Sequence, residues 1–100
     1  MSSNEEGLLR AILATVARQT FSPEDITNIV APQANSAKWI KVYNACDGSL
    51  SQAEIVKKTK VDSSDLSKKI KKWIDAGILV KLADGKTDYP VHVYPIPEVN

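Results

Sequence analysis

The sequence predicts a mostly α-helical fold that ends in a small β-hairpin. Up to residue 77, apolar residues recur at helical spacing in short segments. Helix-capping residues, prolines and glycines separate these segments from one another. From Ile78 onward the apolar period shortens to two, and an Asp84–Gly85 pair separates two apolar runs. A chain of 100 residues, of which 43% are hydrophobic and 25% charged, has the composition of one small folded unit. We therefore expect five helices followed by one hairpin.

The first helix, from about residue 5 to 19, has two unlike sides. Its apolar stripe consists of Leu8, Leu9, Ile12, Leu13 and Val16. Its other side is small or basic: Arg10, Ala11, Ala14 and Arg18. The stripe packs either on the core of its own chain or on a second copy, and we favour a homodimer through this helix. We expect residues 1–34 to form an N-terminal helical extension and residues 35–97 to form the main domain.

Cap residues delimit the second and third helices. Ser22 caps the second helix, with Pro23 at its first position, and Pro32 ends it. Asn35 or Ser36 caps the third helix, which stops before Gly48 because glycine adopts the left-handed conformation readily. The residues of these two helices expected in the core are Ile26, Ile29, Val30, Trp39, Ile40, Tyr43 and Cys46.

The fourth and fifth helices repeat this design. Ser51 and Glu54 match a capping box for a helix that runs to about Thr59. Asp62 caps the fifth helix, and Gly77 ends it. The residues expected to be buried are Ala53 and Ile55 or Val56 from the fourth helix, and Leu66, Ile70, Trp73 and Ile74 from the fifth.

Two strands follow, over Ile78–Leu82 and Val91–Tyr94, and the Asp84–Gly85 turn connects them. Pro90 is expected at the start of the second strand, where a missing amide hydrogen is tolerated. We expect the tail after Tyr94 to be extended and partly frayed.

Positive charge is concentrated in one third of the chain, although the total is only +1. Residues 1–49 carry a net charge of −1, residues 50–81 carry +4, and residues 82–100 carry −2. Between residues 57 and 72 there are seven lysines and two acids. A solvated helix face with acidic partners explains such an excess poorly, so we favour a surface that contacts nucleic acid.

The segment from Leu50 to Leu82, "LSQAEIVKKTKVDSSDLSKKIKKWIDAGILVKL", combines these features in a recognisable order. A leucine precedes a capped helix with a Glu-Ile pair, a valine lies in the turn, a serine lies in mid-helix, and a large apolar residue and a glycine lead into a strand. The residues at these positions are Leu50, Glu54, Ile55, Val61, Ser67, Trp73 and Gly77. The pattern resembles the winged helix-turn-helix domain of MarR- and ArsR-type transcriptional regulators. It departs from those families at Val56, where alanine is common, and at Asp65, where a neutral or basic residue is usual.

The resemblance implies a winged helix-turn-helix with an added N-terminal helical segment, acting as a DNA-binding transcriptional regulator. Its recognition helix (about 63–76) enters the major groove of double-stranded DNA, and its wing (about 78–95) lies alongside. The residues implied to contact DNA from the recognition helix are Ser63, Ser64, Ser67, Lys68, Lys71 and Lys72. Those implied to contact the phosphate backbone are Lys57, Lys58, Lys60 and, in the wing, Lys86. Asp65 fits this surface least, because a carboxylate repels phosphate. For Ser63, Ser64 and Asp65, stabilisation of the helix start is an equally good explanation.

A second hypothesis is a winged-helix module that docks another protein and does not bind DNA. The near-neutral total charge, the acids Asp84 and Asp88 beside the wing, and the lack of arginine in the lysine-rich segment favour it. If the chain dimerises as the regulators do, the helix over residues 5–19 must carry the interface. The C-terminal tail is too short and too rich in proline to supply a helix for it.

The sequence carries no recognisable catalytic or metal-ligating motif. His92 is the only histidine and Cys46 the only cysteine, and the two do not match the spacing of a metal-binding motif. We therefore expect that the protein is not an enzyme and has neither a metal site nor a cofactor. Cys46 is expected in the core; redox sensing is the lesser alternative, since Asp47 would raise its pKa. No apolar run approaches the roughly 20 residues of a membrane span, and the acidic start does not resemble a secretory signal. We expect a cytoplasmic protein without a membrane partner.

Overall fold

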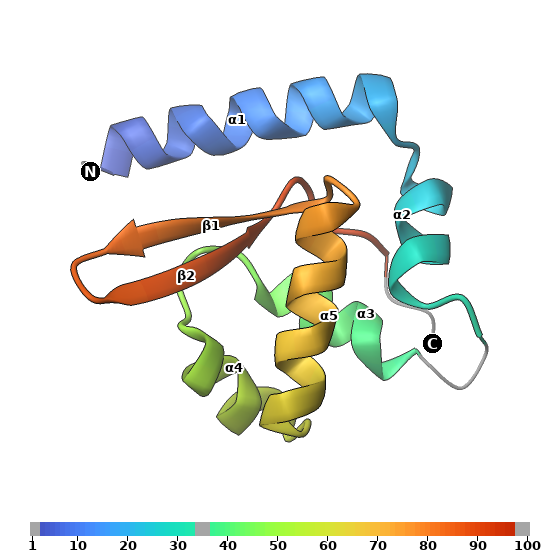
Figure 1. Ribbon diagram of the computed structural model, residues 1–100. Helices are drawn as coiled ribbons and strands as arrows, with labels where there is room; N and C mark the ends of the chain where they lie inside the picture. The colour runs from blue at the N-terminus through green and yellow to red at the C-terminus, as the bar shows by residue number, and fades with distance from the viewer. Residues whose placement is uncertain (1–2, 34–36, 98–100) are drawn as a thin grey trace.

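The computed structural model describes residues 3–33 and 37–97, and these form five α-helices and a two-stranded antiparallel hairpin (Figure 1). The elements are α1 (Ser3–Thr20), α2 (Pro23–Val30), α3 (Lys38–Ala45), α4 (Gln52–Thr59), α5 (Ser63–Asp75), β1 (Leu79–Asp84) and β2 (Thr87–His92). The prediction of a mostly helical chain with a C-terminal hairpin is therefore confirmed. None of the helices in the described parts of the chain is long and apolar enough to cross a membrane.

Capping boxes start α2 and α4, as the sequence predicts. The Ser22 hydroxyl accepts from the Asp25 amide at 3.1 Å, and the Asp25 carboxylate accepts from the Ser22 amide at 3.0 Å. Ser51 and Glu54 make the same reciprocal pair at 3.3 and 2.9 Å. Each box satisfies two amide groups that the first turn of a helix leaves without intrahelical partners.

The two ends of α5 also follow the sequence. The Asp62 carboxylate accepts from the amides of Ser64 and Asp65, each at 3.0 Å. Beyond the helix, Gly77 has a φ of +85°, a conformation that a side chain would strain. The two residues predicted to cap α3, Asn35 and Ser36, lie outside the described residues. Ala37 occupies the N-cap position and makes no side-chain cap hydrogen bond.

The core is organised around three aromatic side chains. Trp73 and Tyr43 are fully buried and meet edge to face, with ring centroids 5.5 Å apart. Trp39 is 7% exposed and meets Trp73 edge to face at 6.3 Å. Ile55 is buried, but Ala53 is exposed, so its predicted burial is wrong. Ala53 lies two residues before Ile55 and therefore points to the opposite side of α4.

The hairpin is longer and placed differently than predicted. β2 begins at Thr87, four residues before the predicted start, and Pro90 lies inside the strand, paired with Lys81. Pro90 is tolerated there because its carbonyl, and hence its nitrogen, faces away from β1. That carbonyl accepts from the Gly48 amide at 3.1 Å, and the Cys46 carbonyl accepts from the His92 amide at 2.6 Å. The segment after α3 thus covers the outer edge of β2.

The tail after β2 is anchored as far as residue 97, and the remainder of the segment expected to be partly frayed lies outside the described residues. Ile96 is 3% exposed. Its carbonyl accepts from the Asn44 side-chain amide at 2.7 Å, and its amide donates to Asn44 Oδ1 at 3.0 Å. Nearby, the Tyr94 hydroxyl donates to the Phe21 carbonyl at 2.6 Å, which ties the tail to the chain between α1 and α2.

α1 lies along one side of the molecule, above the hairpin and α5 in the view of Figure 1. It packs on the rest of the chain through its small and basic side. Ala17 is 5% exposed, and the Arg18 guanidinium lies 4.6 Å from the centroid of the Tyr94 ring. From the apolar stripe, Leu8, Ile12 and Val16 remain 63%, 52% and 58% exposed. These three side chains therefore do not pack on the core of their own chain.

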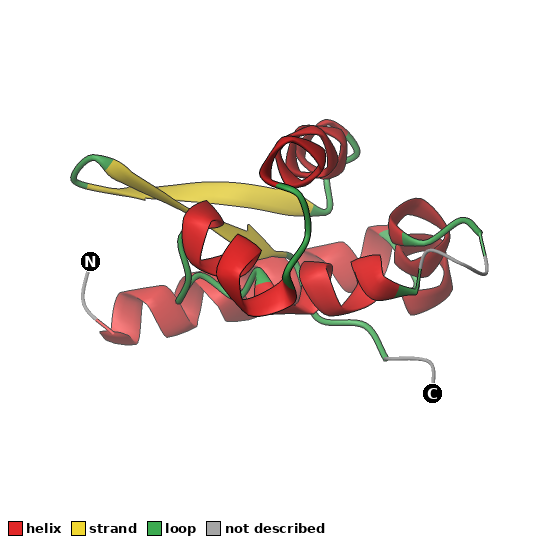
Figure 2. Cartoon of the chain, turned by 90° about the horizontal axis from the view of Figure 1, so that it is seen from below, coloured by secondary structure: helices red, strands yellow, loops and turns green. Residues whose placement is uncertain are grey.

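Figure 2, seen from below, separates α5 and the hairpin from α3 and α4, which form a neighbouring layer. Side chains from all five helices and from the residues after the hairpin meet between these elements in one buried cluster. Leu66, Ile70 and Trp73 of α5 are buried, as predicted, and Ile74, also predicted to be buried, packs half-buried against the core. The opposite side of this helix is therefore turned outward.

Candidate nucleic-acid interface

The outward half of α5 has two flanks of different chemistry. One, here called the lysine flank, holds residues at positions i, i+3, i+4 and i+7 of the helix: Asp65, Lys68, Lys69 and Lys72. The other, here called the serine flank, holds Ser63, Ser64, Ser67 and Lys71. All six residues predicted on this helix are exposed, and they are divided between the flanks. Lys68 and Lys72 lie on the lysine flank, and the remaining four lie on the serine flank.

The serine flank is joined to α4. The Ser67 hydroxyl accepts a hydrogen bond from the Gln52 side-chain amide at 2.6 Å. Because the oxygen accepts from Gln52, the hydroxyl hydrogen of Ser67 remains able to donate to another group. This contact holds the Ser67 side chain against α4 at the exposed surface. Gln52 could not be identified as a partner of Ser67 from the sequence, because the two residues meet only when α4 packs on α5.

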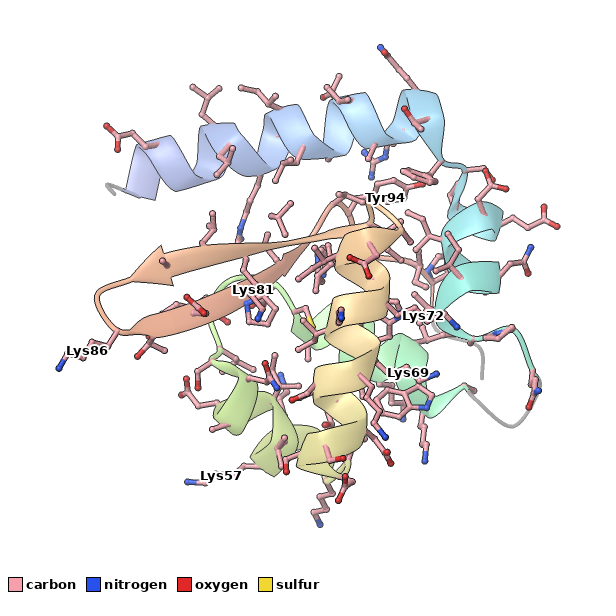
Figure 3. The ribbon with its side chains drawn as sticks, viewed as in Figure 1. Lys57, Lys69, Lys72, Lys81, Lys86 and Tyr94 are labelled. Carbon is pink, nitrogen blue, oxygen red and sulfur yellow. The ribbon has the colours of Figure 1, made fainter. Side chains whose placement is uncertain are left out.

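The lysine flank faces α3 and closes a shallow hollow with it. This hollow, about 410 Å³ in volume, is lined by Lys38, Trp39, Asp65, Lys68, Lys69 and Lys72 and is here called the Trp39 hollow. The ammonium groups of Lys38 and Lys69 lie 5.5 and 5.2 Å from the centroid of the Trp39 ring. Figure 3 shows Lys69 and Lys72 on the side of α5 that faces α2 and α3.

Two lysines of this hollow were missed at the sequence level. Lys69 could have been found, because it follows Asp65 by four residues and so shares a helix side with Lys68 and Lys72. Lys38 could not, because it is brought beside α5 by tertiary packing alone. Asp65 lines the same hollow as three α5 lysines. Its carboxylate therefore lies among positive charges, and also near the positive end of the α5 dipole.

The lysines at the end of α4 do not form one surface. Lys57 points away from α5 and the hairpin in Figure 3. Lys58 lines a second hollow, about 470 Å³, together with Lys38 and Lys41 of α3. Lys60 is the C-cap of α4 and has a left-handed backbone, with a φ of 61°. All three side chains are exposed, but only a partner that curves around α4 would reach them together.

The hairpin carries two exposed lysines. Lys86 lies at its tip, next to Gly85, whose φ is +65°. Lys81 is exposed in the middle of β1 and was not singled out from the sequence. Figure 3 shows Lys81 between α5 and the tip, so the two lysines extend the positive surface away from α5 along the hairpin. Asp88 is exposed near the tip and reduces that charge.

The titratable groups behind the hairpin belong to the core. Cys46 is fully buried, as predicted, and burial raises the pKa of its thiol to about 12, with a further contribution from the Asp47 charge. The thiol donates to the Val42 carbonyl at 3.3 Å, which is not the environment of a reactive thiolate. Among residues 3–33 and 37–97, no three acidic, histidine or cysteine side chains are grouped so as to hold a metal ion.

The exposed lysines of the candidate interface come from α3, α4, α5 and the hairpin. On the two flanks of α5, Ser63, Ser64, Ser67, Lys68, Lys71 and Lys72 are all exposed. Neither a family model, nor a curated protein, nor a solved structure matches the chain.

Proposed function

We propose that this chain is a winged helix-turn-helix protein that binds duplex DNA and regulates transcription, with α5 as its recognition helix and the hairpin as its wing. The observation that carries the proposal is the exposed set of serines and lysines on α5, held outward by the burial of Leu66, Ile70 and Trp73. α4 and a short turn precede α5, and the hairpin follows it, which is the element order of that fold.

The dimensions and chemistry of α5 suit a major groove. Its 13 residues span about 20 Å, at roughly 1.5 Å per residue. The serines lie at its N-terminal end, the part of a recognition helix that approaches base edges. Ser67 has a hydrogen to donate while Gln52 holds its oxygen, so it suits an acceptor such as guanine O6 or N7. Lys68 and Lys71 supply charge for phosphate or guanine.

Lysine is the only basic residue on this surface, and that sets the character of binding. Lysine attracts phosphate as a compact charge, whereas arginine pairs with guanine in a fixed fork. Most of the affinity therefore comes from phosphate contacts and falls steeply with salt. Sequence preference rests on the serine hydroxyls and on whichever lysines reach base edges, so it is modest.

The test is a titration of fluorescently labelled duplex DNA at about 50 and about 200 mM salt. Wild-type protein should bind at the lower concentration and lose at least about tenfold in affinity at the higher one. The Lys68→Glu/Lys71→Glu variant should lose binding and keep its thermal stability, because both side chains are exposed.

A matched pair of single variants controls for total charge. Lys71→Glu and Lys41→Glu change the net charge equally, and both side chains are exposed, but Lys41 lies on α3 outside both flanks of α5. Lys71→Glu should weaken binding much more than Lys41→Glu. Wild-type protein that does not bind duplex DNA even at low salt would contradict the proposal and favour a winged-helix module that docks another protein.

The exposed stripe of α1 supports a homodimer as the DNA-binding species. Leu8, Ile12 and Val16 are spaced by four residues on the side of α1 turned away from its own chain. In an antiparallel two-fold pairing centred on Ile12, Leu8 of each copy meets Val16 of the other. Such a contact is self-complementary, as a two-fold interface must be. A dimer of this kind predicts a palindromic DNA site.

A further inference from the structure

We propose that the Trp39 hollow binds the phosphate backbone of one DNA strand, beside the major groove that α5 enters. This inference rests on the proposed function and adds Lys38 and Lys69 to it. It joins Lys38 of α3 and Lys69 to the predicted α5 lysines in one phosphate-binding surface, and neither of these two residues was among those predicted from the sequence.

The hollow concentrates like charge in a small space. Four lysines and one aspartate line it, so its side chains carry a net charge of +3. They come from two helices that are distant in the sequence, and Lys69 is half-buried. Bringing like charges together raises the free energy of the unliganded protein, and an anion relieves that repulsion. The hollow therefore has an electrostatic preference for a negatively charged partner.

Trp39 makes the floor of the hollow and orders part of that charge. Its ring is 7% exposed, and the ammonium groups of Lys38 and Lys69 lie 5.5 and 5.2 Å from its centroid. Each such contact is an attraction between a cation and the negative face of the ring. Both lysines are thereby held close to the indole, which leaves little ring surface for a base to stack on. A phosphate group suits this arrangement better than an aromatic ring does.

The position of the hollow points to the DNA backbone as the source of the phosphate. A helix with its side chains is about 10–12 Å across, and the major groove is about 12 Å wide. A recognition helix therefore lies against both walls of the groove, each lined by the phosphates of one strand. The lysine flank, extended by Lys38 of α3, would face one wall. Lys71, on the other flank of α5, would face the other wall. The hollow is open to solvent, so a continuous strand can pass over it.

The experiment uses glutamine, which removes the charge and keeps much of the side chain. For wild-type protein and Lys38→Gln/Lys69→Gln, the affinity for duplex DNA is measured at several salt concentrations. The logarithmic slope reports about 0.9 per phosphate contact. The double variant should reduce the slope by about one to two and lower the affinity at low salt by about tenfold or more. The loss should be similar on two duplexes of unrelated sequence, because phosphate contacts carry no sequence information.

Lys41→Gln is the matched control for Lys38→Gln. Both residues lie on exposed positions of α3, three apart, but only Lys38 lines the Trp39 hollow. Lys38→Gln should weaken binding and Lys41→Gln should not, and a thermal melt of each variant should match wild type. If wild-type protein binds DNA and the hollow variants bind with unchanged slope and affinity, this inference is wrong and the proposed function stands. If wild-type protein does not bind DNA, both are wrong.

Discussion

Lys60 is an exposed, positively charged residue whose backbone has a conformation that residues with a Cβ disfavour. In the described parts of the chain it is the one residue other than glycine with a positive φ, at 61°. Its amide donates to the Val56 carbonyl at 2.8 Å and so closes the last turn of α4. A left-handed conformation costs a residue with a Cβ roughly 1–2 kcal/mol. A lysine at this position therefore lowers the stability of the fold, while it places an exposed positive charge at the end of α4, just before α5.

Lys60→Gly should raise the free energy of unfolding by about 0.5–1 kcal/mol. Glycine removes the left-handed strain, and its greater freedom in the unfolded chain offsets part of the gain. The midpoint of urea unfolding measures the change. Lys58→Gly, inside the helix, should instead destabilise by up to about 1 kcal/mol. A Lys60→Gly variant that is less stable than wild type would show that the backbone at this residue is not strained. If Lys60 contacts phosphate, the same variant binds DNA more weakly.

His92 makes the stability of the fold depend on pH. Burial lowers the pKa of His92 below its usual 6.5, against the opposing effects of its contact with the Tyr43 carbonyl at 3.1 Å and the Asp47 charge. The unfolded chain then binds more protons than the folded one below about pH 6.5. Stability is therefore complete above pH 6.5 and is lost as the pH falls from 6.5 through the lowered pKa.

Urea unfolding at pH 7.5 and pH 5.5 tests this dependence. The free energy of unfolding should be lower at pH 5.5, by at most about 1.4 kcal/mol for each unit by which the pKa is lowered. In His92→Gln the difference between the two pH values should largely disappear. Burial raises the pKa of Asp47, but the hydrogen bonds from Ser49 and the charges of Arg10 and His92 together hold it below its usual 3.8, so Asp47 does not titrate in this range. Stability that rises on acidification would contradict the assignment.

At the scale of elements, local chemistry made most helix boundaries predictable. The side chains of Ser22, Ser51 and Asp62 accept hydrogen bonds from amides two or three residues later, and these bonds start α2, α4 and α5. Such caps can be predicted from the residue types and their spacing. The same holds for the end of α5 at Gly77. The hairpin itself was predictable, but the bounds of its second strand were not. The placement of Pro90 inside β2 depends on the Gly48 amide, which is 42 positions earlier in the chain.

In the candidate site, too, features that depend on one helix were predictable, and contacts between helices were not. The helix period alone separates the buried side of α5 from its outward half, so Lys68, Lys71 and the serines could be identified from the sequence. The Gln52–Ser67 hydrogen bond and the approach of Lys38 to α5 could not, because both join different helices. Tertiary contacts thus decide which of the exposed lysines, serines and their partners lie together, whereas the helix period in the sequence indicates only which of them are exposed.

At the scale of the whole molecule, the apolar and the basic surfaces belong to different elements. The apolar stripe lies on α1, and the basic surface lies on α3, α4, α5 and the hairpin (Figure 1). The orientation of α1 produces this separation, because its arginines turn inward. Arg18 lies on the Tyr94 ring, and Arg10 lines the same hollow as His92 behind the hairpin. A second copy on α1 therefore leaves the proposed DNA surface of each copy open.

The size of the α1 stripe sets the strength of the proposed dimer. A helix of 18 residues is about 27 Å long, and its exposed stripe offers three large apolar side chains, whereas a stable interface buries roughly 1,200–2,000 Å² with about 20–30 residues on each side. We therefore expect a monomer at low concentration and a dimer at high concentration, which sedimentation velocity resolves as a mass that rises from 10.9 kDa towards twice that value.

Ile12→Arg should remain monomeric at every concentration, because it places two positive charges at the centre of the two-fold contact. Its thermal stability should equal that of wild type, since Ile12 is 52% exposed. Asn28→Arg adds the same charge at an exposed position of α2 and should still dimerise. On a palindromic duplex with half-sites about 34–36 Å apart, wild-type protein should bind cooperatively, and Ile12→Arg should bind each half-site independently. Wild-type protein that stays monomeric at high concentration would exclude this dimer and leave the stripe for another protein.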